Sequence, residues 1–333
     1  MLQLGIIGTG AIAHHFIAAA HQTKHYQLAA IYSRTMESAK AFAERYQQSL
    51  QLYTDMEEFL TSTIDILYIA SPNSLHHGQA KAALLAGKHV IIEKPAVTRP
   101  EEWADLVTIA KEKQVFVFEA ARNYHEQAFT TISDFLVDKE IWGAHFSYAK
   151  YSSKMPDLLD GKTPNVFSSQ FAGGALMDLG IYPVYASVRL FGAPISARYT
   201  AQQLPNTVDL NGSGQLMYPN FQVTIQTGKN IHSSLPAEIY TNQGTLVLDT
   251  IEHISSAIFH PLKGEAEVLA ITQAPHTMLE EARQFATMIE QPQPELYENW
   301  LAAAQAVHTT LYRMRQDAQI YFEGEPHEND TSC

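Results

Sequence analysis

The stretch GIIGTGAIA, residues 5–13, decides the fold of the first third of this chain. The run LGIIG (4–8) is typical of a buried strand, and a helical pattern follows from about 11 to 22. Between them, G-x-G-x-x-A runs from Gly8 to Ala13. In such a motif the first glycine permits a tight turn and the second lets the backbone approach a pyrophosphate, which the helix N-terminus attracts. In this context the motif predicts a dinucleotide site; the alternative is a glycine turn without a ligand.

Outward from this turn, short apolar runs alternate with helical patterns up to residue 122. Strands that are apolar on both faces and alternate with helices predict a parallel sheet covered on both sides. Right-handed crossovers make this a doubly wound, Rossmann-type α/β domain over residues 1–122. The expected strands are 4–8, 28–33, 50–53, 64–71, the run HVIIEKP (89–95) and 115–120, and the expected helices are 11–22, 35–47, a short one after 53, 75–86 and 100–113.

From residue 123 the pattern changes. After one more helix (123–139), alternating strands follow one another with only turn signals between them, which predicts an open antiparallel sheet and hence an α+β second domain over 123–320. Two helices are expected near 277–290 and 295–317, the latter a candidate to pack back on the first domain. The polar tail, 321–333, is expected to be disordered over its last ten residues.

Composition excludes several classes of protein. The 333 residues are 46% hydrophobic and 17% charged, which is typical of a folded, globular protein, and no apolar run approaches the roughly 20 residues that cross a bilayer. Without a signal-like start, the expected location is the cytoplasm. A net charge of −13 disfavours nucleic acid as a partner. Cys333 is the single cysteine, and the His spacing matches no metal motif, so we expect neither a disulfide nor a metal.

The end of the second strand indicates which dinucleotide binds. An NAD site would place Asp or Glu there, whereas this chain has Ser33, Arg34 and Thr35, which suit the 2′-phosphate of NADP. Arg34 could instead stack on adenine, so NAD stays possible. We expect these three residues to contact the cofactor together with the residues of the glycine turn: Gly8, Thr9, Gly10, Ala11 and Ile12.

Two further strands end in polar residues. In doubly wound sheets, ligands bind beyond the carboxyl ends of strands. ASPNSLHH (70–77) therefore predicts cofactor contacts from Ser71, Asn73 and His76, although Ser74 and Pro72 also fit a plain helix cap and turn.

The run HVIIEKP (89–95) brings Glu93 and Lys94 to the same edge, beside the nicotinamide. A lysine there can hold a substrate hydroxyl and favour alkoxide character. Pro95 can set the turn with a cis peptide. The alternative is a solvated Glu–Lys pair.

These residues resemble the glucose–fructose oxidoreductase / inositol dehydrogenase / MocA family. The resemblance rests on GIIGTGAIA, on SPNSLHHGQAKAALLAGKHVIIEKP (71–95) and on GGALMDLGIYPV (173–184), and it covers residues 1 to about 320. It implies a Rossmann domain and a sheet domain whose exposed face commonly makes dimers, so we expect a homodimer or higher homo-oligomer.

The resemblance also implies that Lys94, Asp178 and Tyr182 form the catalytic group. Asp178 and Tyr182 are four residues apart, which puts both on one face as a helix begins. Tyr at 182, where many members carry His, is similar to the branch of dihydrodiol dehydrogenases and NADP-dependent sugar dehydrogenases. We hypothesise that Tyr182 accepts a hydroxyl proton, aided by the ammonium of Lys94, while hydride moves between nicotinamide and a secondary alcohol or hemiacetal. Asp178 would orient substrate hydroxyls or the Lys94–Tyr182 pair.

The substrate pocket is less readable. Arg122, just past the strand 115–120, is a candidate substrate contact, whereas Tyr124 and His125 are weaker ones. Two departures from the family pattern are Ala172, where a third glycine is frequent, and EAARNYH (119–125), which lacks the Trp or Met before the arginine. Loop candidates for the pocket are Ser152, Lys154, Asp157 and Asn165.

The expected function is an NAD(P)-dependent oxidoreductase, with NADP preferred, that acts on a sugar, polyol or vicinal diol. Two alternatives are an enzyme with a tightly bound, recycled cofactor and a reductase similar to biliverdin reductase. A third is a non-catalytic regulator that senses NADP, although such a regulator would have no need of the three catalytic residues.

Overall fold

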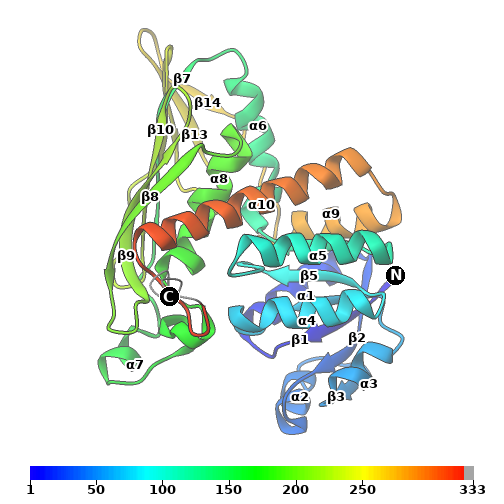
Figure 1. The fold of residues 1–333 in the computed structure, drawn as a ribbon. Coiled ribbons are helices and arrows are strands. Elements are labelled where there is room, and N and C mark those ends of the chain that lie inside the picture. The colour runs from blue at the N-terminus through cyan, green and yellow to red at the C-terminus, as the bar shows by residue number, and fades with distance from the viewer. Residues whose placement is uncertain (326–333) are drawn as a thin grey trace. The chain divides into compact units, whose positions relative to one another are not determined.

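The computed structural model describes residues 1–325, which form two compact units (Figure 1). The first consists of Met1–His125 and Ala274–Gln305, and the second of Glu126–Gln273 and the described residues from Ala306 onward. The break at 125/126 lies close to the predicted boundary at 122/123. Residues 274–305 return to the first unit and give it a second segment. The prediction had assigned these residues to the second domain, 123–320.

The first unit is a six-stranded sheet in which every neighbouring pair of strands is parallel, in the order β3-β2-β1-β4-β5-β6. Its strands are β1 (Leu2–Ile7), β2 (Tyr26–Tyr32), β3 (Gln51–Tyr53), β4 (Ile66–Ile69), β5 (His89–Glu93) and β6 (Val117–Ala120). Its helices are α1 (Ala11–Thr23), α2 (Met36–Ala43), α3 (Met56–Thr61), α4 (His76–Leu85), α5 (Pro100–Lys113), α9 (Leu279–Glu290) and the first part of α10 (Pro294–Asp317). The predicted doubly wound fold is confirmed.

The second segment of the first unit is held by buried aromatic side chains. Trp103 of α5 is fully buried and donates from Nε1 to the carbonyl of Leu301 on α10 at 3.1 Å. Phe118 of β6 stacks on Phe285 of α9 with ring centroids 4.6 Å apart. Because large aromatic side chains bury 150–250 Å² each, α9 and the start of α10 complete the core that the first 125 residues leave open.

The second unit is built on an eight-stranded sheet in the order β14-β13-β12-β11-β7-β10-β9-β8. Its strands are β7 (Ile141–Ala149), β8 (Ser196–Gln203), β9 (Asp209–Met217), β10 (Gln222–Gly228), β11 (Ala237–Thr241), β12 (Gly244–Leu248), β13 (Ala257–Pro261) and β14 (Glu267–Leu269). Its helices are α6 (Gln127–Leu136), α7 (Met155–Leu159), α8 (Ile181–Phe191) and the end of α10. All pairs are antiparallel except β7–β10, which is parallel because the chain passes through α8, β8 and β9 before it returns beside β7.

One face of this sheet packs on helices, and the other carries both polar and apolar side chains. On the packed face, Phe146 of β7 stacks on Phe191 of α8 with parallel rings. Strand register aligns a row across the other face, in which Arg198, Gln215 and Val268 are exposed and the rest are half-buried. This open-face row consists of Arg198, Gln215, Thr224, His145, Glu238, Val247, Ile258 and Val268.

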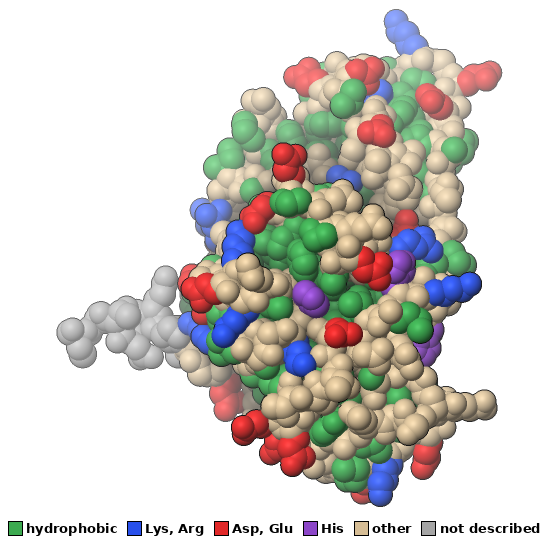
Figure 2. Space-filling view, turned by 90° about the vertical axis from the view of Figure 1, so that its right-hand side faces the viewer, with side chains coloured by type: hydrophobic (Ala, Val, Ile, Leu, Met, Phe, Trp, Pro, Cys, Tyr) green, Lys and Arg blue, Asp and Glu red, His purple; other side chains and the backbone are tan. Residues whose placement is uncertain are grey.

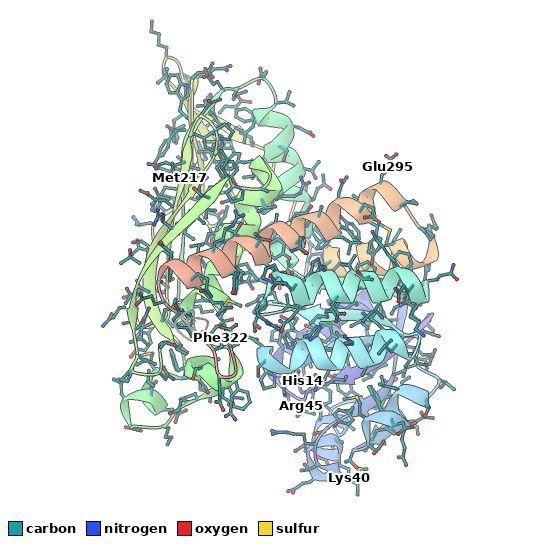
Figure 3. The ribbon with its side chains drawn as sticks, in the orientation of Figure 1. His14, Lys40, Arg45, Met217, Glu295 and Phe322 are labelled. Carbon is teal, nitrogen blue, oxygen red and sulfur yellow. The ribbon has the colours of Figure 1, made fainter. Side chains whose placement is uncertain are left out.

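Some predicted boundaries shift. The helix predicted over 123–139 begins at Gln127, because Arg122–His125 forms a 3-10 turn and Glu126 is extended, with φ −67° and ψ 135°. The start of the predicted tail is packed rather than loose: Phe322, labelled in Figure 3, is buried and lies 4.2 Å from the guanidinium of Arg315, which also binds Glu325. The prediction of disorder for the last ten residues falls almost entirely on 326–333, which lie outside the described residues.

No helix among the described residues is long and apolar enough to cross a membrane. On the face drawn in Figure 2, acidic and basic side chains are interspersed among hydrophobic and other polar ones.

Candidate active site

The polar segments predicted for the cofactor and for Lys94 share one edge of the first sheet. They follow β1, β2, β4, β5 and β6, and these strands are parallel, so their carboxyl ends lie at the same edge. Ligands of doubly wound sheets bind beyond the carboxyl ends of the strands, so these segments of the first unit lie together at the edge where a ligand is expected.

The glycine turn after β1 leaves the start of α1 open. Gly8 has φ +102°, and a Cβ there would lie 2.5 Å from the carbonyl oxygen of Ala70. A Cβ on Gly10 would meet nothing within 4 Å, and Gly10, Ala11 and Ile12 are exposed. Within residues 1–325, no side chain caps the N-terminus of α1, and the first turn of this helix holds no acidic residue. Backbone N–H groups thus face solvent where a pyrophosphate would bind.

The three residues after β2 have different roles in the structure. Ser33 is buried, and Thr35 caps α2 by accepting from the Ser38 N–H at 3.2 Å. Arg34 is exposed, so its guanidinium is the group best placed to meet a ligand from solvent.

The side of the first unit around α2 carries further basic residues. His14 of α1 stacks on Phe42 with ring centroids 4.0 Å apart. Burial lowers the pKa of His14, and the Arg45 cation lowers it further. Figure 3 shows His14 beside Arg45, with Lys40 of α2 beyond them.

The predicted contacts after β4 are partly occupied by the fold itself. Ser71 donates from Oγ to Gln79 at 2.6 Å, and Asn73 begins a 3-10 turn. The His76 ring is buried, with Nε2 2.8 Å from the Ser71 carbonyl and Nδ1 2.9 Å from the Pro95 carbonyl. Because burial lowers the pKa of His76, the ring is neutral near pH 7 and can donate to only one of these carbonyls. His76 joins the turns after β4 and β5, and its contact with a cofactor stays a prediction.

The turn after β5, which carries Lys94, is held by contacts with side chains of two other elements, β6 and α4. The Lys94–Pro95 peptide bond is cis, as the sequence suggested. The N–H of Ala96 donates to Glu119 of β6 at 2.8 Å, and the carbonyl of Pro95 faces His76. Lys94 therefore projects from a turn that two buried side chains fix.

Glu93 is buried rather than solvated, so the alternative of a solvated Glu–Lys pair is wrong for this residue. Its carboxyl group accepts from the hydroxyl of Tyr68 on β4. Burial raises the pKa of Glu93, against the opposing effects of the Lys94 cation, the Tyr68 hydrogen bond and, more weakly, the Arg122 cation. Arg122 thus lies within electrostatic reach of Glu93. Direct contact of Glu93 with a cofactor stays a prediction.

Asp178 and Tyr182 lie where a π-helical turn, Leu176–Gly180, meets α8. The sequence predicted a plain helix start, whereas π turns are rare and frequently found at functional sites. Tyr182 is largely buried and packs edge-on against Tyr148 of β7, with ring centroids 5.1 Å apart. The carboxylate of Asp178, with 35% of its side chain exposed, pairs with the buried ammonium of Lys229.

Sequence reasoning missed Lys229. Its one local signal is a lysine that ends the strand pattern QVTIQTGK (222–229) without an acidic neighbour.

A buried carboxylate fixes the glycine-rich segment before the π turn. Gly174 has φ +124°, and a Cβ there would lie 2.2 Å from Oδ1 of Asp209. Asp209 accepts from the N–H of Leu176 and from the hydroxyl of Tyr199, both at 2.8 Å. Ala172, the departure from the family pattern, has φ +52°, which is the left-handed conformation that favours glycine.

The loop candidates lie in the second unit. Asp157 pairs with Lys162 at 2.9 Å and with Lys154 at 3.7 Å, so the loop satisfies its own charges. A cavity of about 220 Å³ is lined by Tyr148, the residue that contacts Tyr182, and by groups that include Lys150, His232 and Ser233. Among the described residues, no group of three or more His, Cys, Asp or Glu is arranged to hold a metal.

The chain matches family models over both units. The model described as "Oxidoreductase family, NAD-binding Rossmann fold" matches residues 2–121, and that of the GFO/IDH/MocA C-terminal domain matches residues 140–247.

Similar proteins include the uncharacterized oxidoreductase YgjR of Escherichia coli, 36% identical over 299 residues that cover 87% of this chain and 89% of YgjR. The scyllo-inositol 2-dehydrogenase (NADP(+)) IolU of Bacillus subtilis is 33% identical over 301 residues, 90% of this chain and 92% of IolU. A solved structure of the 3-ketoreductase KijD10 from Actinomadura kijaniata with NADP and TDP-benzene has a TM-score of 0.80 at 23% identity and covers 96% of this chain and 99% of KijD10, which shows a shared fold. With both domain models matched and relatives above 30% identity along most of its length, the chain belongs to the Gfo/Idh/MocA family of NAD(P)-binding oxidoreductases.

Proposed function

We propose that this protein transfers a hydride between the nicotinamide C4 of NADP and a secondary alcohol or hemiacetal carbon of a sugar, polyol or vicinal diol. The observation that carries the proposal is the placement of Lys94. Its turn after β5 is fixed by Glu119 and His76 at the sheet edge that also carries the open glycine turn. A lysine held beside a dinucleotide site is suited to bind a reacting hydroxyl.

The residues of the first unit fit a bound dinucleotide. The pyrophosphate would lie on the N–H groups at the start of α1, where Gly10 leaves room for it. The exposed guanidinium of Arg34 would meet the 2′-phosphate of NADP, because Arg offers charged donors in a planar fork. When bound, the nicotinamide supplies the carbon that accepts or donates the hydride.

The proposed roles of the protein's own groups follow from their chemistry. The ammonium of Lys94 would hold the reacting oxygen and stabilise its negative charge. The phenol of Tyr182 would take the hydroxyl proton during oxidation and return it during reduction. The half-exposed carboxylate of Asp178 would accept hydrogen bonds from substrate hydroxyls.

The names of relatives support the substrate class. They include a scyllo-inositol 2-dehydrogenase, a trans-1,2-dihydrobenzene-1,2-diol dehydrogenase from mouse and a D-xylose 1-dehydrogenase from Haloferax volcanii, and two of these three names specify NADP(+). A polyhydroxylated substrate also suits a cavity whose lining includes serine hydroxyls and Lys150.

The first experiment is a screen of inositols, pentoses, hexoses and vicinal diols with NADP+ and NAD+, followed at 340 nm. We expect turnover with at least one polyol and a higher kcat/KM with NADP+. Replacing Arg34 with Ala should weaken the binding of NADP+ by about tenfold, since a charge-assisted hydrogen bond contributes roughly 1.5–3 kcal/mol. The binding of NAD+, which lacks the 2′-phosphate, should be weakened much less. Equal effects on both cofactors would leave Arg34 without a role at the 2′-phosphate.

The second experiment replaces Lys94 with Met and Tyr182 with Phe. Each should lower kcat by about 10²–10⁴-fold, the range for loss of a general acid–base group, while NADPH binding, measured by fluorescence, persists. The matched control for Lys94→Met is Lys111→Met, which removes an exposed lysine of the first unit. Near-normal turnover in Tyr182→Phe would rule out its proposed role.

The same protein preparation separates the alternatives. A dialysed sample that still absorbs near 340 nm would indicate a tightly bound, recycled cofactor. NADP binding with no turnover of any polyol would favour a regulator that senses NADP. Turnover of biliverdin alone would favour a reductase similar to biliverdin reductase.

Two further parts of the proposal concern assembly and location. We propose a homodimer, or a higher homo-oligomer, that forms through the open face of the second sheet, and a cytoplasmic location. The open-face row supports the proposed oligomer.

A further inference from the structure

Lys229 is a buried cation with no assigned role in the proposed reaction. Only 4% of its side chain is exposed, and its Nζ donates to the carboxylate of Asp178. The ring of Phe167 lies 5.8 Å from Nζ. Burial of an ammonium is costly unless the charge is paired, so the ion pair with Asp178 is what makes this position tenable.

The backbone fixes where the Lys229 side chain begins. Lys229 follows β10, and its N–H donates to the carbonyl of Leu210 on β9 at 2.7 Å. Its own carbonyl accepts from the N–H of Ser152, beyond β7, at 2.8 Å. Hydrogen bonds on both sides leave this residue little freedom to move.

The π turn that carries Asp178 is docked on the same end of β10. Thr227 donates from its hydroxyl to the carbonyl of Ala175 at 3.3 Å. A Cβ on Gly180 would lie 3.2 Å from Cγ2 of Thr227 and 2.9 Å from Cδ1 of Leu176. The absence of a side chain at Gly180 lets the turn approach the strand, and this approach brings Asp178 within reach of Lys229.

We propose that Lys229 is a positioning residue, whose ammonium holds the Asp178 carboxylate in the orientation that the reaction needs. Charge-assisted hydrogen bonds are short and directional, so this contact restricts rotation of the carboxylate. The side chain of Asp178 is 35% exposed, so substrate hydroxyls can approach its carboxylate while Lys229 holds it. The inference rests on the proposed function, because it acts through the role assigned there to Asp178.

The test begins with Lys229→Met in the full-length protein, with the polyol that the screen identifies and NADP+. The expected result is a 10–100-fold decrease in kcat/KM, by analogy with the loss of side chains that orient metal ligands, with the Kd for NADPH unchanged. The matched control is Lys139→Met. Lys139 is another lysine of the second unit with a mostly buried side chain, paired with Asp138 at 2.8 Å, and its loss should leave kcat/KM unaltered. Equal activities of the two variants would overturn the inference.

A double variant separates positioning from a general effect on folding. If Lys229 acts through Asp178, then Lys229→Met/Asp178→Asn has the same kcat/KM as Asp178→Asn alone, whereas a merely structural role makes the two losses multiply. Should Lys229→Met fail to fold because it leaves a buried, unpaired carboxylate, the double variant removes the pair together and remains the deciding comparison.

The inference about Lys229 can also be tested if the proposed function fails, by a measurement that needs no substrate. If wild-type protein oxidises no polyol, the proposed function fails, and the inference is then judged by the carboxyl ¹³C resonance of Asp178, assigned with Asp178→Asn. Lys229 at the end of β10 is paired with Asp178, and Tyr182 is a titratable residue four positions further along the chain. Loss of the Lys229 ammonium should raise the pKa of Asp178. An unchanged titration would overturn the inference whatever the substrate is.

Discussion

Gly8 and Gly10 stand two residues apart in one turn, but different constraints act on them. Gly8 has φ +102° and a Cβ there would clash with the backbone of Ala70, whereas a Cβ on Gly10 would meet no atom of the described residues within 4 Å. The fold itself therefore requires glycine at position 8, and only a ligand would require it at position 10.

These constraints give a paired prediction. Gly8→Ala should destabilise the first unit by about 1–3 kcal/mol or more, from left-handed strain and from the clash with Ala70. Gly10→Ala should leave the melting temperature unchanged and weaken NADPH binding at least about tenfold, because its methyl group would occupy the place of the pyrophosphate. Thermal melts and a fluorescence titration check both. Unimpaired NADPH binding by Gly10→Ala would contradict the placement of the phosphates.

At the residue scale, the sequence predicts what depends on local geometry. The tight turn at Gly8 and the cis bond before Pro95 are indicated by the residue types of the turns themselves. Lys229 could not be predicted as the partner of Asp178, because 51 residues separate them and only the tertiary fold brings them together. His76 shows the converse: its residue type and place suggested a ligand contact, and the structure gives both ring nitrogens backbone neighbours.

At the scale of single elements, the π turn before α8 depends on Asp209. Its carboxyl accepts from the N–H of Leu176, the first residue of that turn. Burial raises the pKa of Asp209, and the hydrogen bonds from Tyr199 and Leu176 offset only part of this effect. An acid with a raised pKa in the folded state contributes stability that is fully present below its unfolded pKa and is lost as pH rises through the folded pKa.

Asp209→Asn removes that titration. The difference in free energy of unfolding, variant minus wild type, should therefore increase as the pH rises from about 4 to 8, because only the wild type loses this contribution. Urea denaturation across that range measures it. A difference that does not change with pH would show that Asp209 does not titrate differently in the folded and unfolded states.

Elements with strong periodicity were predicted well and those with long-range causes were not. The parallel strands and α1, α4 and α5 agree with their apolar patterns within a few residues. The π turn of Leu176–Gly180 was missed, because it depends on the contacts of Gly180 with Thr227 on a strand some 45 residues later along the chain. The parallel β7–β10 pair was missed for a similar reason, since no local signal sets strand order.

At the scale of the whole molecule, α10 attaches to the edge strand of the first sheet through Tyr297. Its hydroxyl accepts from the N–H of Val117 at 3.0 Å and donates to the Val117 carbonyl at 3.2 Å. Tyr297→Phe should lower the free energy of unfolding of the first unit by about 1–3 kcal/mol, because buried backbone groups lose their partner. Fluorescence of Trp103 and Trp300 during urea unfolding reports this unit. The control, Tyr53→Phe, removes an exposed hydroxyl contact with Gln51 and should change stability by less than about 0.5 kcal/mol.

The proposed oligomer also belongs to this scale. Thr224 lies in the open-face row, between Gln215 and His145. In a two-fold interface Thr224→Arg would place two added charges near each other, so the variant should run as a monomer in light scattering while the wild type does not. Thr108→Arg, an exposed threonine of α5, is the control. Identical masses for wild type and Thr224→Arg would argue against this face as the interface.

The return of residues 274–305 to the first unit has a consequence for synthesis on the ribosome. Trp103 and its partner Leu301 are 198 residues apart. At about 5–20 residues per second, the nascent chain must keep this indole without its final cover for roughly 10–40 s. During that interval the N-terminal segment exposes an apolar surface that holdase chaperones can bind, and its native packing is completed only after residues 274–305 have been synthesised.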